Sequence, residues 1–97
     1  MTTTNMASSP GEILKEEFLE PLGISQYKLA QAIGKPQSAV SDVIHGRRAI
    51  TPEMARLLGE ALGTTTEFWL ALQATYQAKV IDAAEMPPAA SLIPTEG

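Results

Sequence analysis

The fold is predicted by residues 26–43, which read QYKLAQAIGKPQSAVSDV. Gly34 in this stretch can adopt the left-handed backbone conformation that ends one helix and turns the chain toward the next. On both sides of it, apolar side chains recur with the spacing of a short helix that buries one face. These side chains are Leu29, Ile33, Val40 and Val43. We therefore expect two helices that meet at a steep angle, with the small Ala30 at their crossing.

The predicted pair of helices resembles the helix-turn-helix of phage-repressor-like regulators, and this resemblance implies DNA binding. A helix-turn-helix inserts the start of its second helix into the major groove. The outward side chains there are of types that hydrogen-bond to base edges, such as glutamine to adenine and aspartate to cytosine. The predicted base-contacting residues are Gln37, Ser38, Ser41 and Asp42. For Asp42, a surface charge or an intrahelical partner explains the residue equally well.

Basic side chains are concentrated around this motif, in a chain whose net charge at pH 7 is −4. Residues 25–50 hold four of the seven lysines and arginines but one of the eleven acidic residues. Basic and amide side chains of this kind suit contacts to DNA phosphates, which position a protein without reading sequence. The predicted phosphate-contacting residues are Gln26, Lys28, Lys35, Arg47 and Arg48. On charge alone a solvated face is the better explanation, and the spacing around Gly34 is what favours DNA binding.

Helical signals continue on both sides of the motif, and no stretch alternates polar and apolar residues for long enough to predict a strand. The expected helices cover about residues 10–22, 26–33, 37–45, 52–62 and 66–79. We therefore predict an all-α, five-helix, phage-repressor-like helix-turn-helix domain with disordered termini. Its predicted organisation is a flexible N-terminal tail at 1–9, a DNA-binding and dimerisation domain at 10–82 and an Ala/Pro-rich flexible C-terminal tail at 83–97.

Composition excludes several other classes of protein. Cysteine is absent and His45 is the only histidine, so we expect neither a metal nor a cofactor. The longest apolar run, Phe68–Leu72, is too short to span a membrane, and the N-terminus lacks a signal-peptide pattern. A cytoplasmic protein is therefore expected. Ser41, Asp42 and His45 lie on one short predicted helix with no sign of a catalytic cleft, so we expect no enzyme.

Several short motifs lie between residues 10 and 79: PGEIL at 10–14, EFL at 17–19, PLGIS at 21–25, Ile50-Thr51, Leu57, Gly63 and EFWLALQ at 67–73. Through these motifs the segment resembles the HigA family of antitoxins from bacterial toxin–antitoxin modules. It implies a homodimer that represses its own operon by binding double-stranded, palindromic operator DNA. It also implies that the protein binds and neutralises a HigB-type toxin, which is a ribosome-dependent messenger-RNA endonuclease.

The fifth predicted helix carries apolar side chains on more than one face, which favours contact with a second chain. The predicted dimer interface consists of Phe68, Trp69, Leu72 and Tyr76. The alternative is that Trp69 and Tyr76 close the core of a single chain.

Acidic residues recur every four positions on the first predicted helix, at Glu12, Glu16 and Glu20. A toxin that cleaves messenger RNA is expected to be basic, so these three residues are the candidates for toxin binding. A solvated face of an amphipathic helix is the more common cause of such a pattern. The family resemblance, and not the charge, is what predicts the toxin partner.

Two other functions are compatible with the sequence. The first alternative is a stand-alone helix-turn-helix repressor without a toxin, which would have no small basic protein encoded beside it. The second is a protein-interaction module that has kept the fold but lost DNA binding, and any affinity it showed for promoter DNA would be independent of sequence.

Overall fold

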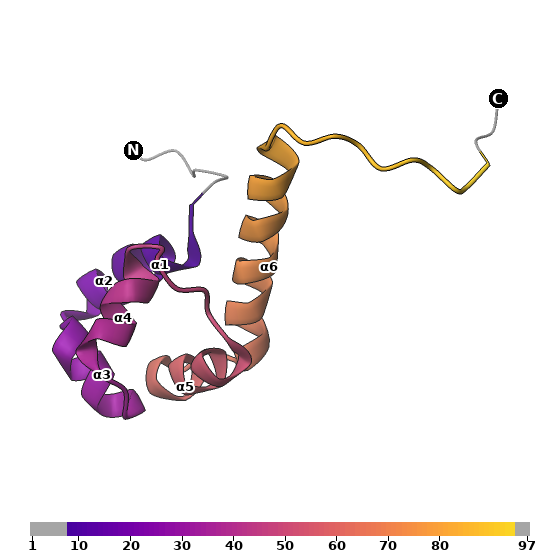
Figure 1. Cartoon of the computed structure of the whole chain (residues 1–97). Helices are drawn as coiled ribbons and strands as arrows, with labels where there is room; N and C mark the ends of the chain where they lie inside the picture. The colour runs from indigo at the N-terminus through magenta and orange to yellow at the C-terminus, as the bar shows by residue number, and fades with distance from the viewer. Residues whose placement is uncertain (1–7, 95–97) are drawn as a thin grey trace.

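A computed structural model describes residues 8–94, and every element of regular structure in that part is a helix (Figure 1). The elements are α1 (Pro10–Ile13), the π-helical turn η1 (Leu14–Leu19), α2 (Glu20–Leu22), α3 (Gln26–Ile33), α4 (Gln37–Ile44), α5 (Pro52–Leu62) and α6 (Thr66–Ala83). The first three follow one another without a break and form one continuous helix, which we call the first helix. The predicted all-α fold with five helices is therefore confirmed. Of the two predicted tails, residues 1–7 and 95–97 lie outside the described residues.

Hydroxyl side chains cap three of the helices, α3, α5 and α6. Ser25, Thr51 and Thr65 each accept a hydrogen bond from the backbone N–H three residues further on, at 3.0–3.1 Å. Each such cap satisfies an N–H that the helix leaves free, and is worth about 1 kcal/mol. Gly34 ends α3 with a φ of 68°, a backbone conformation that residues with a Cβ rarely adopt. The turn between the two helices of the motif thus forms as the sequence predicts.

The first helix contains a π-turn that the sequence analysis does not predict. A proline inside an α-helix lacks an N–H and clashes with the carbonyl four residues earlier, and Pro21 lies in the last turn of this helix. Directly before it, the N–H of Glu20 donates to the carbonyl of Lys15, five residues back instead of four. This wider turn lets the helix continue through Pro21 as far as Leu22.

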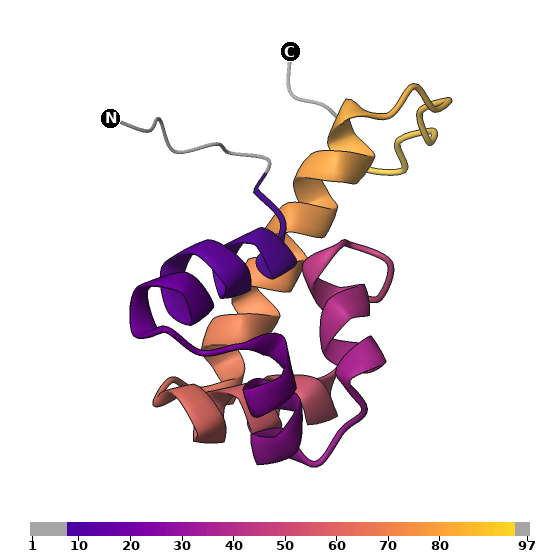
Figure 2. The same ribbon diagram turned by 90° about the vertical axis from the view of Figure 1, so that its left-hand side faces the viewer.

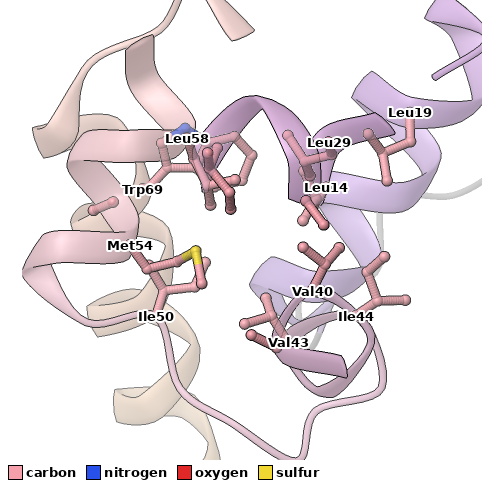
Figure 3. Packing of buried hydrophobic residues seen from close by; sticks show 14 residues of the cluster. Leu14, Leu19, Leu29, Val40, Val43, Ile44, Ile50, Met54, Leu58 and Trp69 are labelled. Atoms are coloured by element: carbon pink, nitrogen blue, oxygen red, sulfur yellow. The ribbon is translucent and has the colours of Figure 1, made fainter. Parts of the chain in front are cut away.

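The hydrophobic core is built from side chains of all five helices and of the α4–α5 loop (Figure 3). Its largest fully buried members are Trp69, Leu14, Leu29, Leu58 and Val40. The Trp69 indole lies inside the core with no exposed surface, and its N–H donates to the Thr64 hydroxyl at 2.7 Å. Trp69 therefore has no surface to offer to a second chain, and its predicted place in the dimer interface is corrected. A large apolar ring with one polar atom is stable inside a core once that atom has a partner.

The last helix is longer than predicted and extends beyond the core. It continues to Ala83, whereas the sequence analysis ends it at about Lys79. Its outer half projects from the bundle (Figure 1), and Val80 and Ile81 there are 49% and 53% exposed. Within residues 8–94, no helix has the length and apolar character needed to cross a membrane.

Candidate nucleic-acid interface

The start of α4 presents an exposed polar edge of the helix-turn-helix. One face of α4 is buried through Ala39, Val40, Val43 and Ile44. At the opposite edge, Gln37 and Ser38 are exposed, while Ser41 and Asp42 are half-buried. The predicted base-contacting residues therefore lie on the side of α4 that faces away from the core. In Figure 2, α4 lies at one edge of the molecule, and the first helix runs from beside the end of α4 to the opposite edge.

The far end of α4 is fixed by a close approach to the first helix. A Cβ placed on the buried Gly11 would lie 2.0 Å from the backbone oxygen of Val43 and 2.8 Å from the Cα of Ile44. Only a residue without a side chain allows the two backbones to come this close. Gly11 lies in the first turn of the first predicted helix, and nothing local in the sequence signals this contact.

Cationic and amide side chains surround the exposed start of α4. Lys28 is exposed and Gln26 is half-buried at the start of α3. Lys35 lies in the turn between α3 and α4, and its Nζ is 3.2 Å from Oε2 of Glu53. The structure therefore gives Lys35 a carboxylate partner, which the sequence analysis does not foresee.

The two arginines of the α4–α5 loop share one carboxylate. Nε of Arg47 lies 3.1 Å from Oδ1 of Asp42, and Nη2 of Arg48 lies 3.5 Å from Oδ2. Both arginine side chains are more than half exposed, whereas the Asp42 side chain is 30% exposed and lies beneath them. Asp42 therefore has partners within its own chain, but they lie in the loop after α4 and are not the intrahelical partner of the second interpretation. A contact of Asp42 with a base stays a prediction.

The side chains considered for catalysis do not form a relay. Nδ1 of His45 lies 2.8 Å from the backbone oxygen of Ser41 and 3.3 Å from its hydroxyl. Asp42 turns instead toward the two arginines, so it does not orient the imidazole.

The acidic residues of the first helix have separate surroundings. Glu12 completes a capping box, in which its carboxylate accepts the N–H of Ser9 at 2.9 Å and the Ser9 hydroxyl accepts the N–H of Glu12. Glu16 is exposed, and Glu20 lies 3.9 Å from Nζ of Lys15. All three carboxylates are on the exposed surface, and Glu12 already has a structural role.

The remaining residues predicted at a dimer interface lie along α6. Phe68 is 37% exposed and packs edge-on against Phe18, with the ring centroids 6.0 Å apart. Leu72 and Tyr76 are half-buried. Tyr76 also lines a groove of about 420 Å³ between the first helix, the α4–α5 loop and the outer half of α6. Val80 and Ile81 form part of this groove; they lie beyond the predicted end of the last helix and are therefore absent from the predicted interface.

The fold and the site together define a helix-turn-helix protein, in which the polar start of the second helix is exposed. A family model described as helix-turn-helix matches residues 15–69. Antitoxin HigA-1 of Vibrio cholerae is 49% identical over 65 residues, which cover 67% of this chain and 61% of that protein. Other relatives carry the names of helix-turn-helix-type transcriptional regulators, from Haemophilus influenzae for example.

Solved structures extend the likeness over more of the chain. The antitoxin HigA of Pseudomonas aeruginosa, solved with the higBA promoter, is 36% identical with a TM-score of 0.76 and covers 79% of this chain and 84% of its own. An addiction module antidote protein of the HigA family from Coxiella burnetii is 34% identical with a TM-score of 0.69, and the match covers 84% of this chain and 98% of that protein. The chain belongs to the helix-turn-helix family and, within it, to the HigA antitoxins. It matches only 61–65% of the length of the curated relatives from V. cholerae and H. influenzae.

Proposed function

We propose that the protein is an antitoxin that neutralises a HigB-type messenger-RNA endonuclease and, as a homodimer, represses its own operon. The observation that carries the DNA-binding part is the start of α4, where polar side chains are exposed while the opposite face of the helix is buried. The relative from P. aeruginosa with the same fold was solved with promoter DNA. The proposal places the protein in the cytoplasm and gives it no catalytic activity.

In this proposal, base reading and phosphate binding fall to different side chains. Gln37, Ser38 and Ser41 face the major groove, where an amide can bond to adenine with two hydrogen bonds and a hydroxyl can donate or accept. Phosphate contacts come from the surrounding edge, which consists of Gln26, Lys28, Lys35, Arg47 and Arg48. Among these, Lys28 and the two arginines are exposed, whereas Lys35 would have to leave Glu53 or share its charge with it.

The proposed homodimer forms through α6 and the groove beside it. Phe68, Leu72 and Tyr76 remain the predicted contacts, and the exposed Val80 and Ile81 extend the same helix beyond the core. We propose that the occupant of the groove is the outer half of α6 from a second copy, because a two-fold axis brings identical patches together. Such a dimer would place its two α4 helices about 34 Å apart, one turn of DNA, and would prefer a palindrome.

The toxin-binding surface in this proposal is the acidic side of the first helix. Glu16 and Glu20 have carboxylates that could meet a basic partner, and Glu12 contributes charge while it keeps its place in the capping box. Acidic residues of this kind raise the rate at which a basic protein finds its binding site. The name antitoxin, carried by the relatives, supports a toxin partner for this chain.

The test is co-expression with the protein encoded next to this chain, followed by binding of the purified complex to the upstream promoter. We expect a small basic protein to co-purify and the promoter duplex to shift at a lower concentration than a scrambled duplex. Absence of a toxin partner with intact promoter binding would leave a stand-alone repressor. Promoter binding that is independent of sequence would contradict the DNA-binding part and favour an interaction module.

A further inference from the structure

The α4–α5 loop holds its two arginines in one arrangement through a single residue, Asp42. The backbone carbonyl of Asp42 accepts the N–H of Arg47 at 2.8 Å and that of Arg48 at 3.2 Å. Its carboxylate reaches both guanidinium groups, one through each oxygen. Main chain and side chain of one residue therefore fix both the path of the loop and the direction of its cations.

The two arginines keep most of their hydrogen-bond donors free. A guanidinium group has five N–H donors in a fixed plane. Arg47 donates to Asp42 through its Nε, and Arg48 approaches the carboxylate through its Nη2, so each contact involves one nitrogen of a guanidinium group. The side chains are 60% and 52% exposed, so unused donors of both are accessible to a phosphate in the single chain, although Arg48 is also one of the residues that line the groove beside α6. The carboxylate thus orients the arginines without occupying the donors that a phosphate would need.

The same carboxylate lowers the positive charge of the loop. Two arginines beside one aspartate carry a net charge of about +1 instead of +2. Binding to random DNA depends almost entirely on such charges, since each cation that neutralises a phosphate releases a counterion. A negative charge at this point therefore weakens binding to every duplex, whereas correct orientation of the arginines benefits only a complex that docks in register.

We propose that Asp42 is a positioning residue that aligns Arg47 and Arg48 for the DNA backbone and raises the preference of the protein for its operator over other DNA. This inference rests on the DNA-binding part of the proposed function. It differs from a base contact of Asp42, because it assigns the effect of the residue to the two arginines.

The experiment compares Asp42→Asn with the wild type on the promoter duplex and on a scrambled duplex, by fluorescence anisotropy over a range of salt concentrations. We expect the variant to bind scrambled DNA about five- to tenfold more tightly at 0.1 M salt, with a salt slope steeper by about 0.9. The affinity of the variant for the promoter duplex should not rise in the same way, because the two arginines lose their alignment. The ratio of the two affinities should therefore fall about five- to tenfold. Asp42→Ala, which also removes the hydrogen-bond acceptor, should lower the ratio further.

Glu60→Gln is the matched control, because it removes one negative charge from an ion pair with an arginine outside this loop. Glu60 lies 2.7 Å from Arg56 on α5. If the Asp42 variants gained affinity equally for the promoter duplex and the scrambled duplex, Asp42 would act only as a negative charge near the arginines. That result would overturn the positioning role. If the Asp42 variants bound scrambled DNA no more tightly than the wild type, the charge effect of Asp42 would be overturned. The same conclusion would follow if Glu60→Gln raised the affinity for scrambled DNA as much as the Asp42 variants do. A wild type without preference for the promoter would instead refute the proposed function, and melting curves of each variant show whether the fold is retained.

Discussion

Replacement of Gly11 by alanine should push the first helix away from α4. The new Cβ would lie 2.0 Å from the backbone oxygen of Val43, where carbon and oxygen normally stay about 3.3 Å apart. The two backbones must then separate by about 1.3 Å, because backbone atoms cannot rotate away as a flexible side chain can. Overpacking of this kind costs about 1–3 kcal/mol, and the rigid contact places Gly11→Ala at the upper end of that range.

The gain in helix propensity offsets only part of this cost. Alanine is preferred over glycine inside a helix by about 0.5–1 kcal/mol, so the expected net loss in the free energy of unfolding is about 2 kcal/mol or more. For a domain of this size, that lowers the melting temperature by about 8–16 °C. Since α4 carries the proposed base contacts, binding to the promoter duplex should weaken as well.

Gly59→Ala is the control for this change, because Gly59 is also buried within a helix. A Cβ there would come no closer than 3.0 Å to the backbone of Thr65, so a shift of a few tenths of an ångström accommodates it. We expect Gly59→Ala to stay within about 1 kcal/mol of the wild type. Thermal melts followed by circular dichroism, with promoter binding measured well below the melting point, compare the two variants. The reasoning is refuted if Gly11→Ala melts no lower than Gly59→Ala and binds the promoter as the wild type does.

Four further substitutions test other parts of the structure. Trp69→Ala should cost about 3–5 kcal/mol in unfolding free energy because the ring is fully buried, and a denaturant titration that shows a loss below 1 kcal/mol would contradict its place in the core. Arg47→Ala should weaken binding to all duplexes and make the salt slope shallower by about one unit, whereas Gln37→Ala should relax preference at one base pair by about 1–3 kcal/mol. Fluorescence anisotropy on operator and random DNA distinguishes the two variants. Equal effects of both variants on the two kinds of DNA would refute the division into phosphate binding by Arg47 and base reading by Gln37. Val80→Asp should reduce the sedimentation mass toward that of one chain without lowering the melting temperature of the monomer, and an unchanged dimer would exclude the outer half of α6 as the contact.

Helix positions were predictable because the signals that set them are local. Gly34 acts within one turn of the helix that it ends, and it behaves as the sequence analysis predicts; Ser25 caps the start of the same helix through an equally local contact. The same holds for Thr51 at the start of α5. The π-turn before Pro21 shows the limit of this approach, since a proline predicts a disturbance of the helix but not how the backbone accommodates it.

The candidate site was predictable in its position but not in its internal contacts. The exposed face of α4 follows from which of its residues are apolar, so Gln37 and Ser38 lie where the spacing places them. The partner of Lys35 is 18 residues away on α5, and no periodicity announces it. Trp69 was misplaced for a related reason: an aromatic residue fits both a core and an interface, and only the packed bundle shows which surface covers it.

By itself, the sequence determined the order of the five helices, the turn at Gly34 and the polar edge of α4, because each depends on neighbours within a few residues along the chain. Only the tertiary structure decided that Trp69 is enclosed, that Gly11 lies against the end of α4 and that Asp42 holds two arginines. These features depend on the direction in which helices and loops pack. That direction results from filling a common core, and no local pattern of residues encodes it.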